Sequence, residues 1–287
     1  MTAEFWLTQA FNGVSYGALL FLLASGLSLI FGVMRIVNLA HGSYFMLGGY
    51  VGLSVMWRTG SFVAAMACGA LAIALIGIAM ERLFLRRLPA TQTLDQVLMT
   101  IGFALIFQDL ALLIWGGDPY TIPTPPMLSG AVRIGDLTFP VYRIFIVAIA
   151  IVVAAALWLA LEGTRTGALI RAAVDDAEMA QGVGINVPTI SLLIFALGAG
   201  LAALGGVIGG GFLGVYPGVD FEVLPYAFVV VIVGGLGSLP GAMVGSLLVG
   251  LLDNFGKALF PELSYFTLFA PMALILALRP TGLFGRG

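Results

Sequence analysis

The stretch VLPYAFVVVIVGGLGSLPGAMVGSLLVGLL, residues 223–252, contains 30 residues without a charged side chain. As one α-helix it would be about 45 Å long at 1.5 Å per residue, whereas the hydrocarbon core of a membrane is about 30 Å thick. Its middle, GGLGSLPG at 234–241, combines helix-breaking glycines with a proline. The stretch predicts two half-helices joined by a tight turn, either a re-entrant hairpin or two short spans. Both versions return the chain to the side from which it came.

The composition of the whole chain indicates an integral membrane protein. Of its 287 residues, 61 % are hydrophobic and 9 % are charged, while a soluble domain carries roughly 25 % charged residues. The formal net charge of −2 implies no polyionic partner such as nucleic acid. A single cysteine, Cys68, excludes an internal disulfide and a cysteine cluster for a metal. A soluble enzyme and a disordered chain are thereby excluded, and an all-α, polytopic membrane helix bundle is expected.

Charged residues divide the chain into apolar segments that are long enough to cross a membrane. Because residues 1–10 contain no Lys or Arg, the first segment is expected to stay in the protein rather than act as a cleaved signal. Small residues four apart, such as Ala202 and Gly206, predict close packing between helices. A proline-rich loop is expected at 116–140. Including the broken pair, about eight or nine spans are predicted, the others at 4–35, 35–58, 58–81, 94–115, 144–161, 189–210 and 265–278.

The positive-inside rule gives these spans an orientation. If the basic cluster at 81–87 is cytoplasmic, eight of the 12 Lys and Arg residues fall inside and four outside. The N-terminus is then outside and the C-terminus cytoplasmic. The residues placed inside are Arg35, Arg82, Arg86, Arg87, Arg165, Arg171, Arg279 and Arg286.

The most polar stretch, residues 162–186, is predicted to lie in the cytoplasm between two spans. Its alanines favour a helix that begins at Thr166 and ends at Gly182 and Gly184. The helix is amphipathic, which is typical either of an ordinary surface helix or of a docking helix for a cytoplasmic partner. Its polar face holds Arg171, Asp175 and Glu178, and its apolar face holds Leu169, Ala173 and Ala180.

Several other function classes lack the residues that they need. A phosphate-binding loop requires Gly-Lys followed by Ser or Thr, but the only lysine, Lys257, is followed by Ala258. Asp95 and Asp109, the only carboxylates on one predicted span, lie about 21 Å apart along a helix and cannot share a proton. An intramembrane enzyme needs a Ser/His or two-Asp pair, and the single histidine, His41, has no carboxylate near it in sequence. A stand-alone secondary transporter or channel stays an alternative.

Six motifs follow one another along the chain. They are NGVSYGAL at 12–19, NLAHG at 38–42, TIG at 100–102 with Gln108, TGALIRA at 166–172 with GIN at 184–186, GGLGSLPGA at 234–242, and RPTGLF at 279–284. Together, from about residue 10 to 285, they resemble the LivH-type permeases of bacterial branched-chain amino-acid ABC importers.

This resemblance implies a membrane-spanning permease subunit that moves branched-chain or related hydrophobic amino acids inward across the bacterial plasma (inner) membrane. Residues 1–287 would form a single transmembrane permease domain with a cytoplasmic coupling segment at about 162–186. The implied partners are a second permease chain, which is a different subunit, two cytoplasmic ATPase subunits that hold ATP and Mg, and an extracytoplasmic substrate-binding protein. No cofactor is expected on this chain, which is not an enzyme. Permeases for urea and short amides belong to the same family, so these are alternative substrates.

Three groups of candidate functional residues follow, with no catalytic or metal-binding group among them. Asn38 and His41 are predicted to lie at a helix break, residues 38–42, that borders the translocation path. For His41, a structural histidine bonded to the backbone of a neighbouring helix is the alternative to a pathway role. The turn at 234–241 is predicted to be packed backbone on the cytoplasmic side. The substrate pathway is assigned Asn38, His41, Gly42 and Gln108; coupling to the ATPase is assigned Thr166, Gly167, Arg171, Asp175, Glu178 and Gly184; the gate or helix break is assigned Gly234, Gly235, Gly237, Ser238, Pro240 and Gly241.

Overall fold

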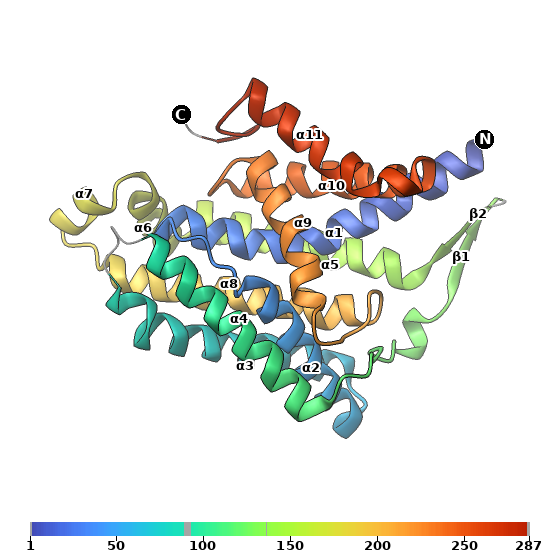
Figure 1. Ribbon diagram of the computed structural model, residues 1–287, viewed down its shortest axis with the longest axis horizontal. Coiled ribbons are helices and arrows are strands. Elements are labelled where there is room, and N and C mark those ends of the chain that lie inside the picture. Colours follow the sequence, from blue (N-terminus) through green and yellow to red (C-terminus); the bar gives the residue numbers. More distant parts are fainter. Residues whose placement is uncertain (1, 89–92, 136, 286–287) are drawn as a thin grey trace.

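The computed structural model describes residues 2–88, 93–135 and 137–285 and is a bundle of helices with one short hairpin (Figure 1). Within these residues, six helices are long and apolar enough to cross a membrane, namely α1, α3, α4, α5, α8 and α10. The prediction of a polytopic all-α membrane protein is thereby confirmed. The main helices are α1 (Ala3–Met34), α2 (His41–Thr59), α3 (Phe62–Leu83), α4 (Thr93–Trp115), α5 (Val141–Gly163), α8 (Val187–Gly210), α9 (Val219–Gly234), α10 (Leu239–Leu259) and α11 (Ser264–Leu278). The shorter elements are α6 (Arg165–Asp175), α7 (Ala177–Gly182), β1 (Ala131–Ile134), β2 (Leu137–Pro140) and the 3₁₀ turns η1 (Leu85–Arg87), η2 (Pro126–Leu128) and η3 (Pro261–Leu263).

The apolar stretch 223–252 is divided between two helices, as its glycines and proline predict. Helix α9 has 16 residues and ends at Gly234, and α10 has 21 residues and begins at Leu239. Gly235 and Gly237 adopt positive φ angles of 106° and 78°, which side chains other than glycine rarely tolerate. Helix α10 is long enough to cross a membrane, whereas α9 is shorter and crosses α1 steeply (Figure 1).

A second break separates α1 from α2. Helix α1 ends at Met34, its C-cap Arg35 has a left-handed φ of 54°, and α2 begins only at His41. The His41 Nε2 atom lies 2.9 Å from the carbonyl oxygen of Leu23, which is 11 residues before the end of α1. Residues 35–40 therefore run back along α1 by about 17 Å. The predicted helix break at 38–42 is confirmed. The predicted span at 35–58 is correspondingly shorter, because the return segment, residues 35–40, uses six of these residues and α2 has 19 residues.

Small residues bring α1 into direct backbone contact with α8 and α10. A Cβ atom on Gly26 would overlap the carbonyl oxygen of Gly198 in α8, and one on Gly250 in α10 would overlap the backbone of Gly13 and Gly17. These contacts allow the helices to approach closely, which is how membrane helices associate where lipid is as apolar as the protein. The small-residue pattern thus reports helix packing.

The proline-rich loop at 116–140 contains a hairpin that the sequence analysis did not predict. Strands β1 and β2 pair antiparallel, with Ala131 opposite Pro140. The hairpin lies at the same end of the bundle as the N-terminus, and α6 and α7 lie at the opposite end (Figure 1). This arrangement agrees with the predicted placement of 116–140 and 162–186 on opposite sides. One of the arginines that are predicted to be cytoplasmic, Arg286, is not among the residues that the structure describes.

The packing contacts predict which glycines tolerate a methyl group. In α8, a Cβ on Gly206 would overlap the carbonyl oxygen of Phe45 in α2, whereas a Cβ on Gly102 in α4 would have nothing within 4 Å. We expect Gly206→Ala to destabilise the fold by about 1–3 kcal/mol through overpacking. Gly102→Ala, the matched control, should leave stability unchanged or slightly raised. Thermal unfolding of the two variants in detergent tests this, and equal midpoints would contradict the packing.

Candidate functional site

The first turns of α2 and α9 meet inside the bundle. The Ser43 hydroxyl in α2 donates a 2.8 Å hydrogen bond to Oδ2 of Asp220 in α9. A Cβ on Gly42 would overlap the carbonyl oxygen of Asp220, so the two backbones touch. Asp220 is 2 % exposed, and its Oδ1 has no hydrogen-bond partner among the described residues. The positive ends of two helix dipoles therefore lie beside one buried carboxylate.

Asp220 was not predicted as a site residue. In the sequence it stands two residues after Gly218, at the start of an apolar helix, which is the ordinary setting of an acidic residue in a first helical turn. Its position beside a predicted half-helix could have marked it as a candidate, because an acidic residue there faces either water or a buried partner. Its pairing with Ser43, 177 positions away, is a tertiary contact that no local pattern contains.

The predicted pathway residues Asn38 and His41 make hydrogen bonds that position the return segment, residues 35–40. Both are fully buried. The Asn38 Oδ1 atom accepts a 3.1 Å hydrogen bond from the amide of Ala40, and the Leu39 amide donates to the hydroxyl of Thr100 in α4. A histidine with a purely structural role is expected to bond to the backbone of a neighbouring helix, and the contact of His41 with the Leu23 carbonyl is of this kind. Asn38 Nδ2 and His41 Nδ1 have no hydrogen-bond partner in the described part of the chain, so a pathway role for these residues stays a prediction.

The other two predicted pathway residues, Gly42 and Gln108, lie around the same junction. The Nε2 atom of Gln108 in α4 would be 3.6 Å from a Cβ on Gly218, the residue before α9. In this connection, the Tyr216 hydroxyl donates a 2.7 Å hydrogen bond to Glu222. Burial and the Glu222 carboxylate raise the pKa of Tyr216 to about 12, so Tyr216 keeps its proton at neutral pH. The fold therefore gathers side chains from three helices at the start of α9.

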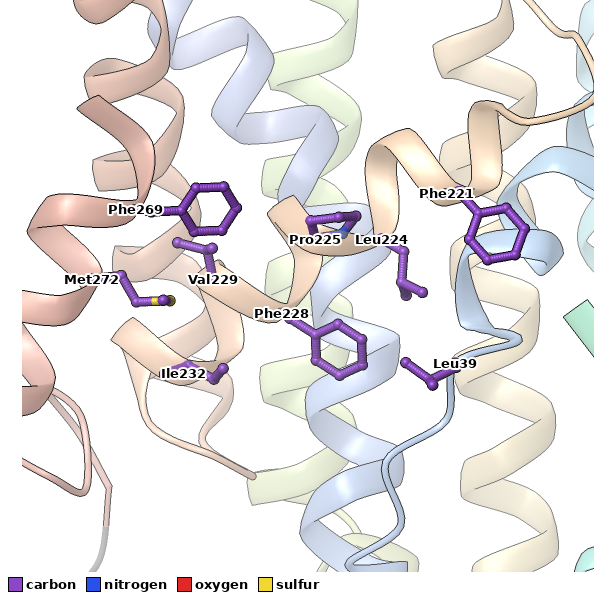
Figure 2. A pocket seen from close by; sticks show the side chains of 9 residues that line it. All are labelled: Leu39, Phe221, Leu224, Pro225, Phe228, Val229, Ile232, Phe269 and Met272. Atoms are coloured by element: carbon purple, nitrogen blue, oxygen red, sulfur yellow. The ribbon is translucent and has the colours of Figure 1, made fainter. Parts of the chain in front are cut away.

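An apolar groove opens beside the junction, and Figure 2 shows its lining. Its volume is about 350 Å³. We call it the α9 groove, because most of its lining comes from α9, with contributions from the return segment and α11. Leu39 and Phe221 are the chain neighbours of Asn38 and Asp220, so the groove adjoins the buried polar cluster. The lining residues are Leu39, Phe221, Leu224, Pro225, Phe228, Val229, Ile232, Phe269 and Met272.

The turn between α9 and α10 is packed backbone. A Cβ on Gly237 would lie 2.8 Å from the Cα of Gly32 in α1, and Gly234 and Gly241 touch through their backbones. The only polar side chain, Ser238, accepts a 3.1 Å hydrogen bond from the Gly241 amide and so caps α10. Pro240 lies in the first turn of that helix, where proline is favoured. The sequence analysis did not predict that the C-terminal segment covers this turn, through hydrogen bonds from the amides of Leu283 and Phe284 to the carbonyls of Val233 and Gly234.

The predicted helix in 162–186 is in fact two helices. Asp176, the residue between α6 and α7, has an extended conformation, and its Oδ1 accepts a hydrogen bond from the Met179 amide and so caps α7. The prediction that the helix begins at Thr166 is also wrong. The N-cap of α6 is Thr164, which has an extended backbone and accepts a 3.0 Å hydrogen bond from the Gly167 amide. A Cβ on Gly167 would overlap the carbonyls that end α5.

The faces of this segment follow the prediction in part. Ala173 and Ala180 are buried, whereas Leu169 is exposed. Arg171 bonds to the carbonyl oxygen of Leu161 and lies 3.3 Å from Glu162, so that α6 is fastened to the end of α5. The remaining members of the predicted coupling group lie on the same segment: Asp175 ends α6, Glu178 is exposed in α7, and Gly184 has a positive φ of 91° after it.

Comparisons with known proteins agree with the motifs. Residues 9–278 match the model of a family described as branched-chain amino acid transport system / permease component. The chain is 31 % identical to BraD of Pseudomonas aeruginosa and to LivH of Escherichia coli K12, both named high-affinity branched-chain amino acid transport system permease proteins. Each match covers 98 % of this chain and 96 % of the relative.

A relative with another named substrate is also similar. The ribose import permease protein RbsC of Escherichia coli K12 is 25 % identical over 95 % of this chain and 84 % of its own length. No solved structure gives a significant match.

The junction of α2 and α9 generates a test by double-mutant cycle. Ser43→Ala leaves a buried carboxylate with one hydrogen bond fewer, which should cost about 1.5–3 kcal/mol. In an Asp220→Asn background the same change should cost clearly less, because the charged acceptor is gone. Thermal unfolding of the four proteins in detergent measures the coupling. As a control, Ser25→Ala removes a buried serine whose hydroxyl, within the described residues, bonds to the Leu22 carbonyl of its own helix, and it should show no coupling to Asp220. Equal coupling of both serines to Asp220 would contradict the proposed contact between α2 and α9.

Proposed function

From the premise that this chain belongs to the family of branched-chain amino acid transport permeases, we propose that it carries branched-chain or related hydrophobic amino acids inward. The chain is a multi-pass membrane permease subunit of an importer and is not an enzyme. The observation that carries the proposal is the nearly full-length similarity to permeases named for these substrates. The similarity to a ribose permease means that the shared scaffold alone does not select the substrate.

The α9 groove supports an aliphatic substrate. Its side-chain lining is apolar, and burying a Val, Leu or Ile side chain from water is worth about 1.5–3 kcal/mol. Urea, short amides and sugars bring polar groups that would lose hydrogen bonds to water in such a lining without replacing them. We place the pathway along the α9 groove and the adjoining junction, where Asn38, His41, Gly42 and Gln108 are the polar candidates. A second permease chain would close the open side.

The proposed complex contains a different permease subunit, two cytoplasmic ATPase subunits and an extracytoplasmic substrate-binding protein, in the bacterial inner membrane. ATP and Mg²⁺ would bind to the ATPase subunits. We place the end with α6 and α7 in the cytoplasm, with the N-terminus outside. Arg35 and Arg86 support this orientation, because they line a cavity together with α6.

The contacts of α6 suggest how ATPase motion would reach the pathway. Arg171 bonds α6 to α5, and α6 also contacts α1, whose last residues Val33 and Met34 line one cavity together with Ala173 of α6. That part of α1 packs against the turn before α10 through Gly32 and Gly237, and Ser28 donates a hydrogen bond to the carbonyl of Ser238. A displacement of α6 against α1 would therefore move the turn that anchors α9 at its C-terminal end. In this mechanism the Gly234–Gly241 turn transmits motion through backbone contacts.

Substrate competition tests the proposed function. The complex, reconstituted with its binding protein and ATPases in proteoliposomes, should take up labelled leucine in an ATP-dependent manner. Unlabelled isoleucine and valine should compete, and urea, acetamide and ribose should not. Competition by urea or ribose but not by isoleucine would transfer the proposal to that substrate class. Uptake without ATPase subunits would instead support a stand-alone transporter.

Arg171 tests the coupling role. Arg171→Ala removes the contacts with Leu161 and Glu162 and should lower leucine uptake at least several-fold, while the complex still assembles. Arg58→Ala, an exposed arginine at the end of α2 outside this network, is the matched control and should transport normally. Uptake and ATP hydrolysis are measured on the same proteoliposomes, and co-purification reports assembly. An assembled Arg171→Ala complex that transports at the wild-type rate would rule out this coupling contact.

A further inference from the structure

A second cavity lies among helix ends on the side of the bundle that holds α6 and α7. Its volume is about 600 Å³, within the range of small-molecule sites. Its walls come from the ends of α1 and α3, from η1, from the starts of α4 and α8, and from α6 and α7. We call it the end cavity. The lining includes Arg35, Glu81, Leu85, Arg86, Ala173 and Val187, together with the carboxylates of Asp175 and Asp176.

Glu81 is the unusual member of this lining. It is 2 % exposed, and its Oε2 atom has no hydrogen-bond partner in the described chain. Within the same residues it forms no ion pair at 4.0 Å or less, although Arg86 lines the same cavity. A buried carboxylate oxygen that accepts no hydrogen bond is costly. With Asp175 and Asp176, Glu81 gives the end cavity three carboxylates against the two arginines Arg35 and Arg86, a surplus that a cationic group would offset.

The arginines and the apolar residues of the lining complement the other parts of one kind of molecule. Arg35 and Arg86 supply positive charge, and guanidinium groups bind carboxylates well. Leu85, Ala173 and Val187 supply apolar surface. An ammonium group beside Glu81, a carboxylate beside the arginines and an aliphatic side chain against the apolar wall together describe a zwitterionic amino acid.

We propose that the end cavity is a regulatory site, through which free cytoplasmic aliphatic amino acid inhibits its own import. This inference rests on the proposed function, which supplies both the ligand class and the cytoplasmic position. Glu81 and Arg86 belong to α3 and η1, while Ala173 belongs to α6, so a bound ligand bridges the membrane-spanning bundle and the coupling segment. A ligand that binds one arrangement of α6 more tightly shifts the population toward that arrangement. Import then slows as the product accumulates inside.

The test uses the complete importer in proteoliposomes that are preloaded with unlabelled leucine. Initial uptake of labelled leucine from outside should fall several-fold as internal leucine rises into the millimolar range. Glu81→Gln and Arg86→Gln should raise the internal leucine concentration for half-inhibition by about ten-fold or more, since each removes one charge-assisted contact. Both variants should keep the uptake rate that empty vesicles show. Internal acetate or isobutylamine, each resembling only part of the ligand, should inhibit far less than leucine.

Arg82→Gln is the matched control, because Arg82 is exposed beside Glu81 but does not line the end cavity. It should be inhibited like the wild type. If the wild type imports no leucine at all, the proposed function fails. If it imports leucine but internal leucine has no effect, or the Glu81 and Arg86 variants are inhibited as strongly as the wild type, only the regulatory site is refuted. Loss of ATPase co-purification in these two variants would show that the end cavity receives an ATPase side chain, which also overturns the inference.

Discussion

Two helices of this permease begin inside an apolar bundle, and the unpaired backbone groups at those starts constrain the rest of the structure. The first four amides of a helix have no partner within it, and hydrocarbon offers none. At the start of α2 the chain supplies Asn38 and the Thr100 hydroxyl as local partners. The Ser43 and Asp220 side chains then join α2 to the start of α9. The breaks are tolerated because protein groups surround them.

This requirement explains why α1 is so closely surrounded. A return segment that runs along α1 leaves room for α8 and α10 only if the helices approach to backbone contact. Gly26 against Gly198 and Gly250 against Gly13 provide that approach. The large glycine content of the chain therefore has a packing role at these positions. The same close approach brings the turn at Gly237 onto α1, which links the two helix breaks through one central helix.

The resulting bundle separates its chemistry by position. An apolar groove lies along α9, a buried polar cluster lies at the junction of α2 and α9, and charged groups of both signs line the end cavity beside α6. With the α9 groove as the proposed pathway, a scaffold of this kind would serve different substrates if the groove lining changes while the packing glycines stay. That view is consistent with the similarity of this chain to permeases named for amino acids and to one named for ribose.

The sequence by itself determined the features that depend on local chemistry. Hydropathy predicted the membrane class and most spans, since each long span carries its own apolar signal. The glycines and proline at 234–241 predicted the break between α9 and α10, because backbone freedom and a missing amide act where they occur. The motifs, taken in order, predicted the family. Tertiary structure alone decided the return of residues 35–40 along α1, which depends on Leu23 and Thr100. It also decided the burial of Asp220 against Ser43, and the gathering of Glu81 with α6 around one cavity. These features rest on contacts between residues far apart in the chain, and single-residue chemistry contains no information about which distant partner will satisfy a buried polar group.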